Sequence, residues 1–209
     1  MSLIWGVGQT TQAALQGAGI RSFADLLRWE HAELVARFGS MGARLWHLAR
    51  GEDFRRVSAD APVKSISNET TFGEDIADAD LLDGHLWRLS EKVADRAKAR
   101  ALAGGVVTLK LKRADHGLLT RRQALREPTQ LADTLYRAAR ALFDQVPRGT
   151  AWRLLGVGLS ELTPEAVADR AGDLLDPQAS RRAEAERAAD RIRARFGAEA
   201  IVKGRALRQ

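Results

Sequence analysis

Val106–Arg113 (VVTLKLKR) decides the fold of the second half of this chain, because apolar and polar residues alternate along it. An alternation of period two predicts a β-strand with one covered face and one exposed face. The apolar side chains are those of Val107, Leu109 and Leu111, and the polar ones are those of Thr108, Lys110 and Lys112. The strand therefore needs a hydrophobic layer on one side and leaves its cationic side to solvent or to a ligand.

Further strands and amphipathic helices surround this strand between residues 64 and 163. The predicted elements are, in order, a strand over Lys64–Phe72 (KSISNETTF), a helix over Asp78–Ala103 ended by Gly104-Gly105, strands over Val106–Arg113 and Leu118–Leu125, a helix over Thr129–Val146 and a strand over Trp152–Leu162. The helices carry apolar residues at spacings of three and four. The order β-α-β-β-α-β predicts an α+β fold, in which two helices pack on one face of a four-stranded sheet.

The N-terminal segment Ile4–Thr11 (IWGVGQTT) places two glycines around one apolar residue, directly before an apolar-periodic helix. Glycine permits tight backbone angles and close approach of a foreign surface. The amides of such a turn and of the following helix N-terminus form a phosphate site. The segment therefore predicts the hairpin of a helix-hairpin-helix motif, although a plain connection between helices has the same pattern.

The positions of glycine, proline and capping residues predict the boundaries of four segments. They are an all-helical domain over residues 1–57, a linker over 58–63, the sheet domain over 64–163 and a C-terminal tail over 164–209 that is helical or partly disordered. In the first segment Ser22 and Ser40 are predicted helix caps. In the tail, Ala179–Phe196 is charged on most sides, so we expect either an exposed helix docked by one edge or a disordered segment.

The composition favours a polyanionic partner without proving one. The chain has 33 Lys and Arg against 27 Asp and Glu, a net charge of +6, and the excess is spread along the sequence. An ordinary protein rich in arginine has the same balance. Cysteine is absent, which fits a reducing cytoplasm, and no apolar run is long enough to span a bilayer. We expect a monomeric cytoplasmic protein with no membrane partner.

Four sequence features in this order resemble the Y-family translesion DNA polymerases of the DinB type. They are the glycine hairpin, the ARGED segment over Ala49–Asp53, KSISNETTF over Lys64–Phe72 and WRLLGVGLS over Trp152–Ser160. The resemblance covers roughly residues 4–163. It implies that residues 1–57 are a thumb domain and residues 64–163 a little-finger domain that grips the phosphates of primer–template DNA.

The resemblance also implies that the catalytic site lies in a palm and fingers region, where carboxylates hold magnesium. We therefore expect a DNA-holding fragment of a DNA-directed DNA polymerase in DNA repair, with no catalytic residue and no cofactor of its own, and inactive alone. Four scattered histidines and the carboxylates Asp78, Asp80 and Asp83 show no metal or catalytic pattern, and the three carboxylates suit the start of a helix. Two alternatives remain: the same region of a catalytically inactive scaffold, or an unrelated helix-hairpin-helix repair module, which predicts no sheet after Pro62.

The predicted DNA contacts come from five segments. They are the hairpin residues Gly6, Val7, Gly8, Gln9 and Thr10, the first-strand residues Lys64, Ser65, Ile66, Ser67 and Asn68, the cations Lys110 and Lys112, the third-strand residues Thr120, Arg121 and Arg122, and the last-strand residues Arg153, Gly156, Gly158 and Ser160. Glycine inside a strand often marks close approach of a foreign backbone. Three positions depart from the family pattern. Gly158 and Gln9 stand where basic residues are frequent, and Trp5 stands where many such hairpins have proline.

Near the C-terminus, polymerases of this type carry a short apolar peptide that docks on the sliding clamp. Leu174 and Leu175, between two aspartates, lie at about the right place but lack the usual glutamine and aromatic residue. They are either a degenerate clamp peptide or an ordinary helix end.

Overall fold

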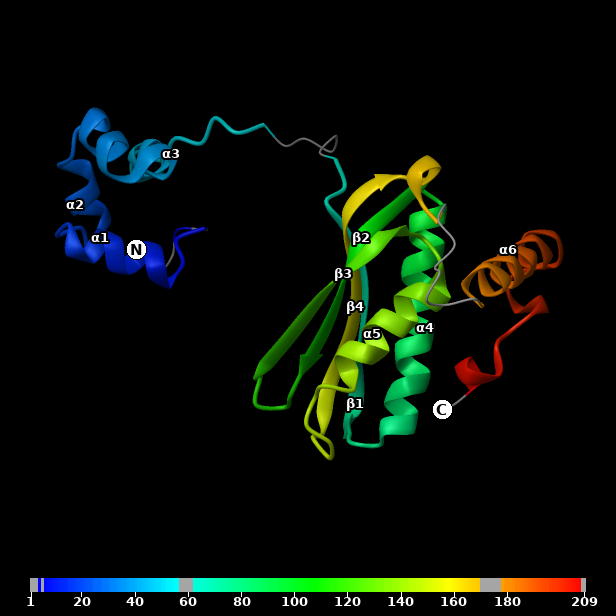
Figure 1. Cartoon of the computed structure of the whole chain (residues 1–209). Coiled ribbons are helices and arrows are strands. Elements are labelled where there is room, and N and C mark those ends of the chain that lie inside the picture. Colours follow the sequence, from blue (N-terminus) through cyan, green and yellow to red (C-terminus); the bar gives the residue numbers. More distant parts are fainter. Residues whose placement is uncertain (1–3, 5, 57–61, 170–177, 208–209) are drawn as a thin grey trace. The chain divides into compact units, whose positions relative to one another are not determined.

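The computed structural model describes residues 4, 6–56, 62–169 and 178–207 in two compact units, one up to residue 61 and one from Pro62 onward. The first unit consists of the helices α1 (Gln9–Gly17), α2 (Phe23–Leu27) and α3 (His31–Ala49) (Figure 1). Ser22 caps α2 in a reciprocal capping box with Asp25, as the sequence predicted. The helix α3 is kinked at Gly39, where the backbone leaves helical angles.

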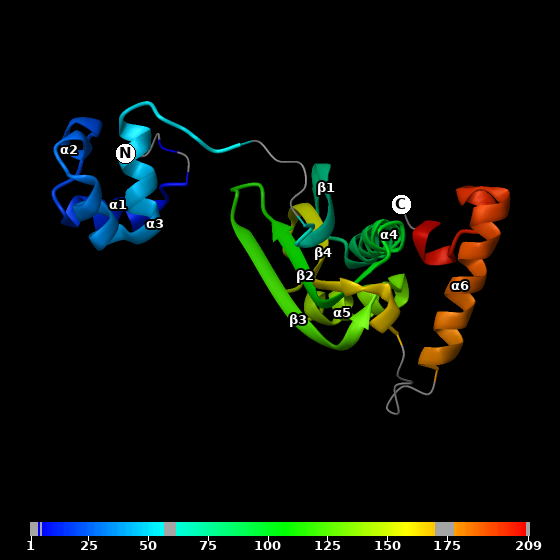
Figure 2. The same ribbon diagram turned by 90° about the horizontal axis from the view of Figure 1, so that it is seen from above.

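The second unit is built on a four-stranded sheet in the order β1-β4-β2-β3, in which all neighbours are antiparallel. Its strands are β1 (Ser65–Ile76), β2 (Leu102–Lys112), β3 (Leu118–Thr129) and β4 (Trp152–Pro164). The helices α4 (Ala79–Lys98) and α5 (Ala132–Phe143) pack side by side on one face (Figures 1 and 2). The predicted α+β fold is confirmed, and the alternative without a sheet after Pro62 is wrong.

The core of the second unit lies between the sheet and these two helices. Val107, Leu109 and Leu111 of β2 are buried in it, as their alternation predicted. They meet the apolar stripes of α4 and α5, which include Leu86, Leu89, Val93, Leu135 and Leu142. Each buried aliphatic side chain of this kind contributes about 1.5–3 kcal/mol through removal of its surface from water. The covered face of the sheet is therefore the main source of stability.

The end of α4 differs from the prediction. The helix stops at Lys98, and Gly104 and Gly105 lie inside β2 instead of ending the helix. The reason is a close approach: a Cβ atom at Gly104 would lie 2.5 Å from Leu159 Cγ and 2.9 Å from the Ser160 carbonyl oxygen. Ala101, with a φ of 52°, makes the turn between helix and strand. Gly104 is thus required by strand packing.

Two of the three aspartates at the start of α4 have different roles. Asp78 caps the helix by accepting from the amides of Asp80 (2.8 Å) and Leu81 (3.1 Å), which agrees with the helix-start interpretation. Asp83 is buried and accepts from the Tyr136 hydroxyl (2.5 Å) and from Arg140 Nη1 (2.8 Å) of α5. The helix-dipole explanation is therefore wrong for Asp83, which fastens α4 to α5.

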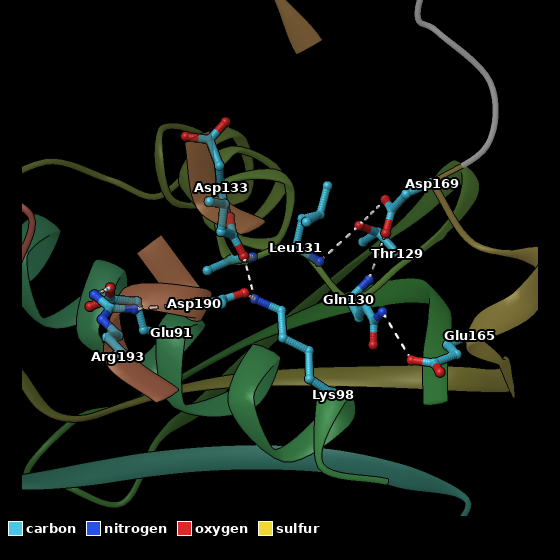
Figure 3. Close-up of polar contacts among 12 residues, drawn as sticks. Glu91, Lys98, Thr129, Gln130, Leu131, Asp133, Glu165, Asp169, Asp190 and Arg193 are labelled. Atoms are coloured by element: carbon cyan, nitrogen blue, oxygen red, sulfur yellow. Dashed lines mark hydrogen bonds and ion pairs between the residues drawn. The ribbon is translucent and has the colours of Figure 1, made fainter. Parts of the chain in front are cut away.

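The tail docks on the outer side of the helix layer. After η1 (Glu165–Val167), it forms α6 (Ala179–Phe196) and the single turns η2 (Ala198–Ala200) and η3 (Gly204–Leu207). The buried Glu186 accepts from Lys98 Nζ (2.8 Å) and from the amides of Ala132 (2.7 Å) and Asp133 (3.1 Å), so it caps α5 from another helix. Figure 3 shows the neighbouring contacts, in which Lys98 meets Asp190 and Arg193 meets Glu91. Of the two predicted possibilities, Ala179–Phe196 is a helix docked by one edge.

Candidate nucleic-acid interface

The face of the sheet opposite α4 and α5 is a candidate binding surface, which we call the open face. Residues paired across antiparallel strands project to the same side. The register places two rows on the open face, Ser67–Gly158–Thr108–Arg122 and Glu69–Gly156–Lys110–Thr120. Ser65, Ser160 and Lys112 lie on the same side. The strands thus bring together hydroxyls, cations and two glycines from four separate segments.

Several predicted contact residues lie elsewhere. Arg121 pairs with Leu109 and Asn68 with Val157, so both project to the covered side of the sheet. Ile66 is only 5% exposed and belongs to the core. Arg153 forms an ion pair with Asp75 and donates from Nη1 to the Gly73 carbonyl (3.2 Å). Lys64 precedes β1 and is exposed.

The two glycines of β4 have different surroundings. At Gly158 a Cβ atom would make only ordinary contacts, 3.5 Å from Ser67 Cβ and 3.7 Å from Thr108 Cβ. At Gly156 it would lie 3.0 Å from Glu69 Cβ and 3.5 Å from Lys110 Cβ. The space above Gly158 is therefore open to a foreign backbone, whereas Gly156 lies between two long side chains of opposite charge.

Two carboxylates on this surface were not predicted from the sequence. Glu69 Oε2 lies 2.8 Å from Lys110 Nζ, and Glu161 Oε1 lies 3.8 Å from Arg122 Nη2. All four side chains are substantially exposed. Glu69 could have been found, because the period of two places it on one face with Ser65 and Ser67. The pairing of Glu161 depends on a register that no local pattern specifies.

The hairpin of the first unit is the second candidate surface. Gly6 has a φ of 88°, a region that favours glycine, and the Val7 amide donates to the Ile4 carbonyl (3.0 Å) to close the turn. Gly8 is the N-cap of α1 and provides no side-chain cap. Because the first amides of a helix have no partner within it, the start of α1 is suited to an anion.

The predicted hairpin residues divide between the surface and the core. Gly6, Gly8, Gln9 and Thr10 are exposed, whereas the Val7 side chain is only 6% exposed and joins Ile4 in the helical core. Arg44 of α3 was not predicted. A Cβ atom at Gly6 would lie 3.0 Å from Arg44 Nη1, so α3 brings a guanidinium to the hairpin.

Three further features bear on function: a metal-binding group, a membrane-spanning helix and the predicted clamp peptide. Among the residues that the structure describes, no three His, Asp or Glu side chains form a metal-binding group. None of the described helices is long and apolar enough to cross a membrane. Leu174 and Leu175, the predicted clamp peptide, lie outside the described residues.

Residues 63–174, more than half of the chain, match the impB/mucB/samB family C-terminal domain. The chain belongs to this family. It is 45% identical over 204 residues to a DNA polymerase IV of Brucella melitensis, covering 98% of this chain and 46% of that protein. It is 43% identical over 209 residues to a DNA polymerase IV of Caulobacter vibrioides, covering 100% of this chain and 51% of that protein. The chain therefore spans about half the length of these curated relatives.

A solved structure gives the same fold. The Y-family DNA polymerase chimera Dbh-Dpo4(243-245)-Dbh matches 78% of this chain and 47% of its own, with a TM-score of 0.55 and 19% sequence identity. At this identity the likeness concerns the fold alone. Together with the relatives, it confirms the predicted resemblance to the C-terminal region of Y-family polymerases.

Proposed function

We propose that this chain is the DNA-holding part of a Y-family translesion DNA polymerase and that it grips the phosphates of primer–template DNA. The observation that carries this proposal is the open face, which the helices of its unit leave uncovered and which gathers Lys110, Lys112 and Arg122 with hydroxyls and a glycine. Lysine, arginine and hydroxyl side chains are the usual donors to phosphate oxygens. Contacts of this kind hold a duplex without reading its sequence, which suits a polymerase that acts at many sites.

The two rows of the open face contribute differently. In the row of Gly158, Ser67 and Thr108 offer hydroxyls on both sides of a flat stretch of backbone, and Arg122 lies at the end of the row. A DNA backbone can approach this row most closely. The hairpin provides a separate grip, in which the exposed start of α1 and Arg44 attract a phosphate.

We assign the nucleotidyl-transfer chemistry to the parts of the relatives that this chain does not match, since it spans about half of their length. Magnesium belongs to that part of the proposal. The described residues of this chain offer no ligand group for it, so we derive no step through a metal. A catalytically inactive relative would grip DNA in the same way. Magnesium-dependent primer extension by the full-length protein distinguishes the enzyme from such a scaffold.

Three further parts of the proposal rest on the sequence. The absence of cysteine supports the reducing cytoplasm. The resemblance supports a monomer and a sliding clamp as a second partner through Leu174 and Leu175. Alanine at both leucines should abolish clamp stimulation of the full-length protein and leave its DNA binding intact.

The first test of the proposal is the salt dependence of binding to a short primer–template duplex. With about four to six phosphates contacted, the logarithm of the association constant should fall with the logarithm of salt concentration at a slope of about −4 to −5. Duplexes of different sequence should bind alike. A slope near zero would contradict the proposal, as would template-directed extension by these 209 residues alone.

Two neighbouring arginines provide a matched test of the surface. Arg122→Met should weaken binding about fivefold to tenfold at about 0.1 M salt and make the slope less negative by about 1, because one phosphate contact is lost. Arg121→Met removes the same charge one residue away, on the covered side of the sheet, and should change affinity less than twofold. Equal effects of the two substitutions would show that DNA does not bind the open face.

A further inference from the structure

Two of the three cations of the open face are already paired with carboxylates of the same chain. Lys110 lies 2.8 Å from Glu69, and Arg122 lies 3.8 Å from Glu161. Lys112 has no ion pair among the residues that the structure describes. A phosphate that reaches this surface therefore meets cations with negative charges beside them.

The contact between Glu69 and Lys110 crosses a strand. These residues belong to β1 and β2, and Gly156 of β4 lies between them in the same row. The strands β1 and β2 lie on either side of β4 and are about 10 Å apart, twice the spacing of neighbouring strands. The pair therefore forms only because both side chains are long and extend over β4. A side chain at position 156 would stand between them, since its Cβ atom would lie 3.0 Å from Glu69 Cβ. The glycine at this position thus makes room for an ion pair.

This ion pair can be exchanged for a phosphate. The Lys110 and Glu69 side chains are 39% and 50% exposed, and exposed pairs contribute only about 0.2–1 kcal/mol. A phosphate can therefore displace the carboxylate from Lys110. The displaced Glu69 carboxylate then remains close to the phosphate and repels it.

We propose that Glu69, assisted by Glu161, weakens DNA binding by competing with phosphate for the cations of the open face. The carboxylates keep the grip loose, so that the duplex is released readily. This inference rests on the proposed function, because it requires duplex phosphates to contact the open face.

The test is the affinity of Glu69→Gln for the same primer–template duplex. Loss of the competing carboxylate should tighten binding about fivefold to tenfold at about 0.1 M salt and make the salt slope more negative by about 1, since Lys110 becomes a full phosphate contact. Glu161→Gln should give a smaller gain, about twofold to threefold, because its ion pair with Arg122 is longer. Glu184→Gln makes the same charge change at an exposed position of α6, outside the two rows of the open face, and should change affinity less than twofold.

A double substitution separates a specific effect of Glu69 from a general effect of charge. Lys110→Gln should itself weaken binding, because it removes a phosphate contact and leaves the Glu69 carboxylate without its cation. Added to Glu69→Gln, it should remove most of the gain. Equal affinity and slope for Glu69→Gln and the natural sequence, while Arg122→Met still weakens binding, would overturn this inference and leave the proposed function intact. A salt slope near zero for the natural sequence would overturn both.

Discussion

The two faces of the same four strands differ in burial and in the chemistry of their side chains. On the covered face, Leu109, Val157 and Leu155 are almost completely buried against α4 and α5. On the open face, the residues next to them in sequence are Lys110, Gly158 and Gly156. Because side chains alternate along a strand, the residues that stabilise the fold and those that we propose to bind DNA alternate within one element. Substitutions at neighbouring positions should therefore have unrelated effects.

The largest difference is expected at Leu109 and its neighbour Thr108. Leu109→Ala should lower the free energy of unfolding by about 2–5 kcal/mol, because it removes buried methyl groups and leaves a cavity between the sheet and the helices. Denaturant unfolding of the purified chain measures this change.

Thr108→Ala is the matched control on the open face, and its free energy of unfolding should stay within about 0.5 kcal/mol of the natural value. The same substitution should weaken DNA binding, since it removes a hydroxyl beside Gly158. A large stability loss at Thr108 together with a small one at Leu109 would mean that the two faces are assigned the wrong way round.

Glycine-to-alanine substitutions sharpen the comparison at a smaller scale. Gly104→Ala should destabilise the chain by about 1–3 kcal/mol, because its Cβ atom would overlap Leu159 and the Ser160 carbonyl. Gly158→Ala meets only ordinary contacts. It should therefore leave stability unchanged or raise it by up to about 1 kcal/mol, since alanine loses less conformational freedom on folding.

DNA binding of the Gly158→Ala variant completes this comparison. If a phosphate backbone approaches Gly158 closely, the added methyl group should weaken binding even though the chain is equally stable. Undiminished affinity in a duplex titration would show that the glycine serves only the sheet.

The fold could be predicted from the sequence because its signals are local. The alternation of Val106–Arg113 and the three- and four-residue spacing in the helices each depend on one short segment. The boundary at Gly104-Gly105 could not be predicted, because the need for glycine comes from Leu159, 55 residues further along. The docking of α6 also depends on distant partners, since its main buried residue is the charged Glu186.

The candidate site could be predicted only in part for the same reason. The period of two in β2 placed Lys110 and Lys112 correctly on the polar face. In β3, two consecutive leucines, Leu118 and Leu119, break the alternation, so the sequence did not show which of Arg121 and Arg122 lies on the open face. The pairs of Glu69 and Glu161 with the cations require the register across strands.

The smallest expected effect is on the pH dependence of stability, for which a buried carboxylate is compared with an exposed one. Asp169 lies at the junction of β3 and α5, where it accepts from the Thr129 hydroxyl (2.6 Å) and the Gln130 amide (3.3 Å). Burial raises the pKa of this carboxyl above its ordinary value of 3.8, and the two hydrogen bonds only partly oppose the shift. Asp115, in the exposed turn between β2 and β3, has a lowered pKa because it accepts from the Gly117 amide (2.8 Å).

These opposite shifts predict opposite dependences of stability on pH. Because the pKa of Asp169 is higher in the folded state than in the unfolded state, its ionisation lowers the free energy of unfolding as pH rises above about 3.8. This loss disappears as pH falls below about 3.8, where the carboxyl is protonated in both states. The asparagine amide removes the charge but can accept only one of the two hydrogen bonds. The free energy of unfolding of Asp169→Asn should therefore rise relative to the natural chain between pH 3 and pH 7 by less than about 1 kcal/mol, the size of one hydrogen bond, and asparagine tolerates the φ of 51° at this position. Asp115→Asn should slightly lower stability at pH 7, and its effect should also vanish in acid. Denaturant unfolding of both variants from pH 7 to pH 3 measures the two trends, and a loss of stability in Asp169→Asn at pH 7 would show that its hydrogen bonds outweigh its burial.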